Sequence, residues 1–171
     1  LDAGSLMIGE SSDSLSPTKG PLGTGTLTIA GGTSLFADHS VIKTERTLHN
    51  AVVVNGDFTI GGSGNAALTL AGTINLGSSA RTITFATAGL TTTFNGILST
   101  GVTSGTGLTK AGNGILQLGS SSMLNLGNAG LTVAAGVIKA GTTDNLSADS
   151  LLTVNSGAGY DLNGNYQTSN A

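Results

Sequence analysis

A short unit of alternating apolar and polar residues, closed by a glycine or asparagine turn, recurs along this chain. Its clearest copy is 108–118, which reads L-T-K-A-G-N-G-I-L-Q-L: a strand with one lysine, a glycine turn and a second alternating strand. Strand segments with the same alternation occur at 26–29 (T-L-T-I), 58–60 (F-T-I), 67–70 (A-L-T-L), 82–85 (T-I-T-F) and 91–94 (T-T-T-F). Such self-similarity predicts a stack of small repeated units.

The composition narrows the class of protein further. Of 171 residues, 28 are glycine, two are proline and 9% are charged, whereas ordinary domains have about 25% charged residues. Thr, Ser and Asn replace charged residues as polar partners, and 38% hydrophobic residues argue against disorder. Scarce proline and the lack of a three-residue glycine period exclude collagen. The absence of cysteine excludes disulfide frameworks, thiolate zinc sites and cysteine nucleophiles.

Charge and hydropathy exclude two kinds of partner. The net charge of −3 and the lack of a basic cluster make nucleic acid an unsuitable ligand. No apolar run approaches the ~20 residues that span a bilayer, so we expect no membrane-spanning segment. The opening L-D-A-G-S-L resembles neither an initiator sequence nor a signal peptide, and we expect the chain to be a fragment of a longer protein.

Alternation at period two predicts strands with one apolar face throughout. The pairs that carry it are Leu27/Ile29, Val52/Val54, Phe58/Ile60, Leu68/Leu70, Ile74/Leu76, Ile83/Phe85, Leu116/Leu118, Leu124/Leu126, Leu131/Val133, Val137/Lys139 and Leu152/Val154. The expected fold is all-β, a right-handed parallel β-helix (β-solenoid) formed by 1–171 as a single segment. Coils of about 20 residues would give roughly eight coils. An antiparallel sandwich or barrel fits less well, because the strands are short and the turns frequent.

Three stretches depart from this alternation. Asp38 to Asn50 is charged and free of glycine, and its threonines favour an extended segment with a loop. Glu10 to Pro21 and Gly141 to Ser150 are expected to be irregular connectors.

Residues 107–141 resemble the autotransporter-associated β-strand repeat of type V secreted and other large bacterial surface proteins. That pattern is G-L-x-K-x-G-x-G-x-L-x-L, a variable turn and then x-T-x-V-x-x-G-x-L, and it is matched here by Leu108, Lys110, Gly112, Gly114, Leu116, Leu118, Val133, Gly136 and Ile138. P-L-G-T-G-T-L-T-I at 21–29, R-T-L-H-N at 46–50, N-G-D-F-T-I-G-G at 55–62 and Y-D-L-N-G-N-Y-Q-T at 160–168 resemble the segments that separate such repeats. Met123-Leu-Asn-Leu-Gly stands where the family has an aromatic residue and T-G-G-T. The resemblance implies a scaffold exported to the bacterial surface, without catalytic residues.

Side chains that suggest chemistry are scattered. Asp38, His39 and Ser40, with His49 nearby, hold the residue types of a catalytic triad, but triads converge in space rather than in sequence, so structural roles are expected. The two histidines, ten residues apart, make a poor zinc site. Gly23-Thr-Gly25 and Gly112-Asn-Gly114 read as turns, because neither opens a helix.

Carboxylates and hydroxyls offer three further candidates. Asp144 and Asp149 are the closest approach to a carboxylate pair, and a solvated turn is the preferred interpretation. Asp57 is expected to serve the turn after Asn55-Gly56. Lys43, Glu45 and Arg46 form a charge-dense spot, read as a solvated edge in preference to a recognition loop. Hydroxyl rows at Thr82/Thr84 and Thr91/Thr92/Thr93 could bind ordered water or sugars, although threonine is also a common strand residue.

The expected function is that of a non-enzymatic, surface-displayed or secreted passenger segment, acting as an adhesin or as a stalk. Its partners would be surface glycans, host or matrix proteins, or copies of itself, with no catalytic, cofactor-binding or metal-binding residues. The alternative is a structural filament or sheath component that assembles end to end. A β-helical polysaccharide-degrading enzyme is the third hypothesis, and it would need a carboxylate cluster on one face.

Overall fold

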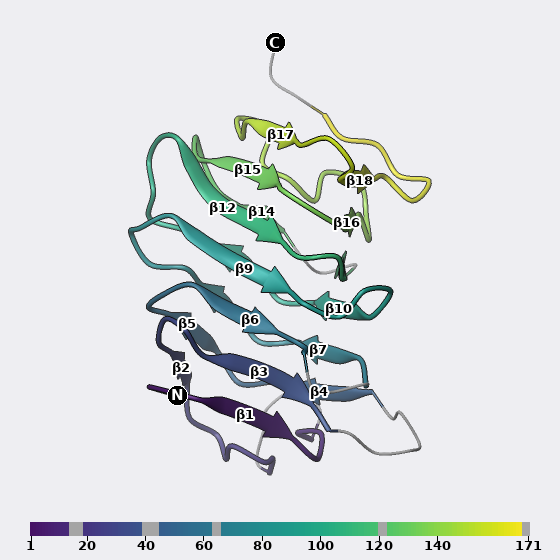
Figure 1. The fold of residues 1–171 in the computed structure, drawn as a ribbon. Coiled ribbons are helices and arrows are strands. Elements are labelled where there is room, and N and C mark those ends of the chain that lie inside the picture. The colour runs from purple at the N-terminus through teal and green to yellow at the C-terminus, as the bar shows by residue number, and fades with distance from the viewer. Residues whose placement is uncertain (14–18, 39–44, 63–65, 120–122, 169–171) are drawn as a thin grey trace.

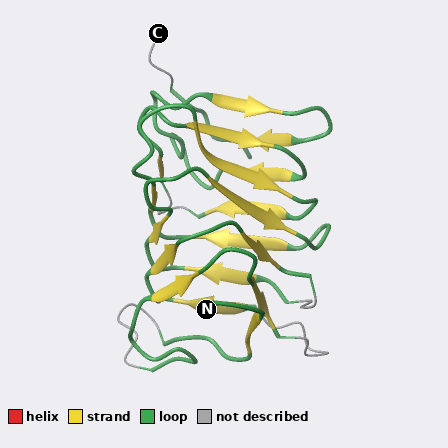
Figure 2. Cartoon of the chain, turned by 60° about the vertical axis from the view of Figure 1, so that its left-hand side comes forward, coloured by secondary structure: helices red, strands yellow, loops and turns green. Residues whose placement is uncertain are grey.

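The computed structural model describes residues 1–13, 19–38, 45–62, 66–119 and 123–168. These residues form eighteen short strands and no helix, so the all-β prediction is confirmed (Figures 1 and 2). Sheet A contains, in spatial order, β1 (Ser5–Ile8), β3 (Ser34–Ala37), β6 (Phe58–Ile60), β9 (Arg81–Phe85), β12 (Thr106–Ala111), β15 (Gly130–Val133) and β17 (Leu152–Val154). Sheet B contains β2 (Leu27–Ile29), β5 (Val52–Val54), β8 (Ile74–Asn75), β11 (Leu98–Ser99) and β14 (Leu124–Asn125). Sheet C contains β4 (Arg46–Leu48), β7 (Leu68–Leu70), β10 (Thr91–Phe94), β13 (Ile115–Leu118), β16 (Val137–Lys139) and β18 (Gly159–Asp161).

In the middle of the molecule, from β3 to β16, each turn of the chain adds one parallel strand to each sheet, which makes the molecule a β-solenoid. In Figure 1 the strands of sheet A run from left to right at the front, and the chain returns along sheet C and climbs from the N-terminus to the C-terminus. That sense of winding is right-handed, the common hand for parallel connections. All strand pairs among the described residues are parallel, for example β10 with β13 and β3 with β6.

The turns are longer and fewer than the sequence predicted. Leu131 pairs with Leu152, and Ser5 pairs with Ser34, so one turn takes between 21 and 29 residues. The chain therefore completes about five turns rather than eight. The prediction was wrong because polar corner segments add residues without adding strands.

The core is a column of aliphatic side chains enclosed by the three sheets. Alternation turns Leu68, Leu116 and Ile138 inward at one level of sheet C, where successive strands pair in register. Phe85 and Phe94 fill the wider part of the column, with ring centroids 5.9 Å apart. β16 corrects the sequence analysis, because Ile138 is the buried residue of that strand and the predicted inward pair Val137/Lys139 faces outward.

Glycine is required where neighbouring turns touch. The corner that follows sheet C brings the backbone of each turn against the one below it, so a Cβ atom on Gly72 would overlap the carbonyl of Asn50. A Cβ atom on Gly96 would in turn overlap the carbonyl of Gly72. Backbone contact at this corner leaves no room for a side chain, which explains why glycines recur here at roughly one per turn.

The two ends of the stack differ. At the N-terminal end, the Ser12 amide donates to the Thr47 carbonyl (2.8 Å) and the Leu1 ammonium donates to the Thr28 carbonyl (2.6 Å), which covers the edges of sheets C and B. At the C-terminal end, Leu152 and Val154 lie over the fully buried Leu131 and Val133 but are 38% and 43% exposed. No helix long and apolar enough to cross a membrane occurs among the described residues.

Candidate functional site

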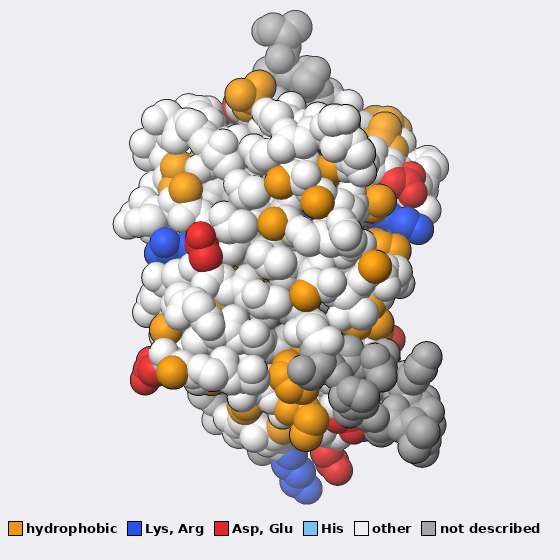
Figure 3. Space-filling model, in the orientation of Figure 1, with side chains coloured by type: hydrophobic (Ala, Val, Ile, Leu, Met, Phe, Trp, Pro, Cys, Tyr) orange, Lys and Arg blue, Asp and Glu red, His pale blue; other side chains and the backbone are white. Residues whose placement is uncertain are grey.

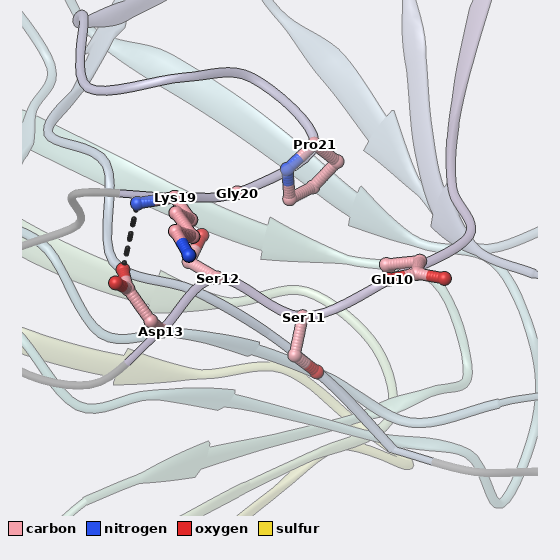
Figure 4. Close-up of a pocket in the computed structure, with 7 residues that line it drawn as sticks. All are labelled: Glu10, Ser11, Ser12, Asp13, Lys19, Gly20 and Pro21. Atoms are coloured by element: carbon pink, nitrogen blue, oxygen red, sulfur yellow. Dashed lines mark hydrogen bonds between the residues drawn. The ribbon is translucent and has the colours of Figure 1, made fainter.

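One hollow lies at the N-terminal end, between residues 10–13 and 19–21. It has a volume of about 510 Å³ and is lined by Glu10, Ser11, Ser12, Asp13, Lys19, Gly20 and Pro21 (Figure 4). The Lys19 amide donates to Asp13 Oδ1 (3.1 Å), while Glu10 lies at the other end of the hollow and points away from Asp13. The two carboxylates therefore do not form the close pair that acid–base hydrolysis of a polysaccharide needs.

Buried Asn50 binds Ser12 in the lining of the hollow and the chain that follows Pro21. Its side-chain amide donates to the carbonyls of Gly23 (3.0 Å) and Gly25 (2.7 Å), and its Oδ1 accepts a hydrogen bond from Ser12 (3.5 Å). The polar groups around the hollow thus serve the fold. The Gly23-Thr-Gly25 motif supplies acceptors to a side chain, in keeping with the predicted turn.

Only part of the triad-like cluster suggested by the sequence, Asp38 and His49, lies among the described residues. His39, Ser40 and Lys43 lie outside the described residues. Asp38 Oδ2 accepts a hydrogen bond from Arg46 (2.8 Å), and both side chains are only 16% exposed. Burial strengthens the attraction within such an ion pair. Removal of either side chain would leave the other charge buried without compensation, which is strongly destabilising.

The charge-dense spot is therefore less solvated than the sequence suggested. Arg46 turns inward at the start of the column that continues with Leu68, and Glu45 accepts a hydrogen bond from Thr69 on the next turn. The prediction of a solvated edge was wrong for Arg46, because its position in the alternation points it toward the core. The predicted extended character of this stretch is confirmed at Arg46–Leu48. His49 Nδ1 is buried and has no hydrogen-bond partner among the described residues.

The remaining carboxylates hold one turn to the next. Asp57 Oδ1 accepts a hydrogen bond from the Thr82 amide (2.8 Å), and Asp144 Oδ1 accepts one from the Thr168 amide (2.6 Å). Asp57 thus reaches across to the following turn, which is a wider role than the local turn that the sequence suggested. Within the described part of the chain, no group of three or more His, Cys, Asp or Glu residues is placed to hold a metal ion.

The most unusual titratable group is Lys110, which sequence analysis treated only as part of a repeat. It is fully buried, and its ammonium donates to the carbonyls of Gly112 (2.6 Å) and Ala135 (2.8 Å) while lying 5.2 Å from the centroid of the Phe85 ring. Burial lowers the pKa of Lys110 to about 8. The signal was present in the sequence, since Lys110 lies two residues after inward-facing Leu108.

Glycines shape the cradle around this lysine. Gly112 has a φ of +75°, and a Cβ atom on Gly136 would lie 2.6 Å from Lys110 Nζ and 2.5 Å from the Gly114 carbonyl. The K-x-G-x-G spacing therefore has a physical explanation: the lysine donates to the carbonyls of two stacked turns, and glycines let those turns approach it. A fully buried ammonium with these contacts ties turns together and is closed to a substrate.

Hydroxyl rows occur on two outer faces. Thr82 and Thr84 lie side by side on the outer face of sheet A, as the sequence suggested. The second predicted row is divided, because Thr92 is buried whereas Thr91 and Thr93 face outward.

A scan against protein-family models and searches among curated proteins and solved structures found no match to this chain.

Proposed function

We propose that this chain is a non-enzymatic segment of a surface-displayed or secreted bacterial β-helical passenger, acting as an adhesin or as the stalk that extends one. The observation that carries the proposal is the use of its chemically capable side chains to join successive turns. Lys110 bridges carbonyls of two turns, Asp57 binds an amide of the following turn, and Asp144 does the same near the C-terminal end.

The form of the stack also suits an extended spacer. About five turns at the inter-strand distance of about 4.8 Å give a column on the order of 24 Å tall, whose height grows only by adding turns. Its outer faces carry hydroxyl and amide side chains, which can contact a ligand at many weak points at once.

A retention assay separates adhesin from stalk. The purified chain is passed over insoluble polysaccharides, matrix proteins and cells, and saturable retention competed by the soluble form of one ligand identifies an adhesin. Retention on none of them identifies a spacer. Specific turnover of any polysaccharide by this chain would contradict the proposal.

The second candidate is a filament component that assembles end to end. It is favoured by the apolar, partly exposed Leu152 and Val154 on the last strand of sheet A, because an open parallel edge can pair with another strand. Sedimentation that rises with protein concentration is expected, and Val154→Lys should reduce it. Ile97→Lys, which changes an exposed residue on the side of the column, is the matched control and should leave it unchanged.

A further inference from the structure

The outer face of sheet A carries two rows of hydroxyl groups, which lie beside each other on β9; one row extends from there to β3 and the other to β17. Register pairing aligns Ser34 with Thr59 and Thr59 with Thr84 in one row. It aligns Thr82 with Thr109, Thr109 with Thr132 and Thr132 with Thr153 in the other. These residues are called the hydroxyl face: Ser34, Thr59, Thr82, Thr84, Thr109, Thr132 and Thr153.

The spacing within each row is set by the fold rather than by the side chains. Neighbouring strands lie about 4.8 Å apart, and residues two apart along a strand lie about 6.6 Å apart. Threonine is branched at Cβ and has few rotamers in a strand, so its hydroxyl is held in a fixed direction at little further entropic cost. Behind the face, Ile83 and Val133 are fully buried and hold the strands rigidly.

This spacing matches a network of tetrahedrally bonded water. A water molecule that makes hydrogen bonds of about 2.8 Å to two oxygen atoms at the tetrahedral angle places those oxygens about 4.6 Å apart. Successive hydroxyls in a row are therefore separated by nearly the distance between second neighbours in ice. One water can join each pair of hydroxyls without distorting its own geometry.

Charged side chains are sparse on this face. Its middle is largely free of Lys, Arg, Asp and Glu side chains (Figure 3). Of the charged residues next to it, Asp57 binds the Thr82 amide and the Arg81 guanidinium donates to the Val54 carbonyl (3.2 Å). A hollow of about 250 Å³, lined partly by Asp57, Thr59, Thr82 and Thr84, leaves room for several waters against the hydroxyls.

We propose that the hydroxyl face holds an ice-like layer of water and through it binds the surface of ice. Binding many waters to a preformed array costs little additional entropy, because the sheet already fixes the hydroxyl groups that the waters contact. The proposal stands independently of the adhesin or stalk function, since it rests on the geometry of sheet A alone.

The test grows ice slowly in a dilute solution of the 171-residue chain and measures the fraction of protein taken up by the ice, together with the gap between melting and freezing points. We expect enrichment in the ice and a gap that saturates with concentration. Thr109→Tyr should abolish both effects because the ring holds the face off the ice, and Thr109→Val should weaken them by removing a hydroxyl while keeping the shape.

Thr93→Tyr is the matched control, because Thr93 faces outward from sheet C, between Thr69 and Gln117, and the hydroxyl row ends there. It should retain full uptake, and circular dichroism should show that all variants stay folded. Exclusion of the unaltered chain from ice would overturn the proposal. So would equal losses in Thr109→Tyr and Thr93→Tyr, because the effect would then not reside in the hydroxyl face.

Discussion

Replacing Lys110 by methionine tests how a buried charge stabilises this column. Methionine has a similar length and fills irregular spaces, so Lys110→Met removes the ammonium with little change in packing. The carbonyls of Gly112 and Ala135 then lose their donor, and the Phe85 ring loses its cation.

The expected size of the effect follows from two opposing contributions. Two hydrogen bonds from a charged donor contribute about 2 kcal/mol each, and the contact with the ring contributes about 1 kcal/mol. Against them stands the cost of burial, about 3 kcal/mol, which corresponds to the fall in the pKa of Lys110 from 10.5 to about 8. We therefore expect Lys110→Met to lower the free energy of unfolding by about 2 kcal/mol at pH 7.

Urea unfolding followed by far-UV circular dichroism measures this difference. Lys139→Met is the matched control, because Lys139 lies on the outer side of β16 and its loss removes the same charge. Stacked repeats can unfold in stages, so the midpoints and slopes of both variants should be compared. If Lys110→Met proves as stable as Lys139→Met, the ammonium gives no net stabilisation and the reasoning is wrong.

The same group predicts a dependence on pH. Because the folded-state pKa of Lys110 is lowered, the unfolded chain binds more protons between about pH 8 and 10.5, and the free energy of unfolding should rise over that interval by up to about 3 kcal/mol. The neutral amine keeps two N–H donors for the same carbonyls. Burial raises the pKa of Tyr160 to about 12, which acts in the opposite direction above pH 10, so the rise is measured as the difference between the unaltered chain and Lys110→Met. A flat difference from pH 7 to 10 would refute it.

Two further substitutions probe the contacts between turns. Gly96→Ala should destabilise the column by about 2 kcal/mol or more, because its Cβ atom would overlap the Gly72 carbonyl of the turn below. In the same urea assay Gly101→Ala should be nearly neutral, because the nearest atoms to its Cβ lie 3.5 Å away. Equal effects of the two substitutions would contradict the close-contact explanation. Asn50→Ala should loosen the chain that follows Lys19 and speed tryptic cleavage after Lys19 roughly tenfold, because two hydrogen bonds to the Gly23 and Gly25 carbonyls are lost. Asn75→Ala, an exposed asparagine, should leave the cleavage rate unchanged, and no difference between the two variants would count against the anchoring role.

Sequence patterns predicted the strands well because period two determines directly which side of a strand faces the core. The predictions failed where the residues of a strand did not show which of its two faces is buried. In V-I-K at 137–139, the alternation alone favours either face, and the pairing of Ile138 with Leu116 decides it. The predicted number of turns was wrong for another reason. The length of a polar corner cannot be read from the hydrophobic periodicity of the strands.

Charged residues were the least predictable part of the candidate site. A lone lysine or arginine in a strand is expected to face water, yet Lys110 and Arg46 turn inward because the strand's alternation fixes their direction. Each has a partner inside that comes from another segment: Lys110 donates to the Ala135 carbonyl as well as to nearby Gly112, and Arg46 pairs with Asp38. Partners brought together by the fold cannot be read from local sequence.

The hydrogen bonds between turns run along the axis of the column, and β1 and β17 lie at its opposite ends (Figure 1). A pulling force on the two termini therefore loads these bonds one turn after another, peeling the outermost turn first. Releasing one turn of 21 to 29 residues exchanges about 5 Å of height for roughly 80 Å of extended chain. Under tension the molecule would thus lengthen in large, separate steps, each from the unfolding of one turn, while the remaining turns stay folded.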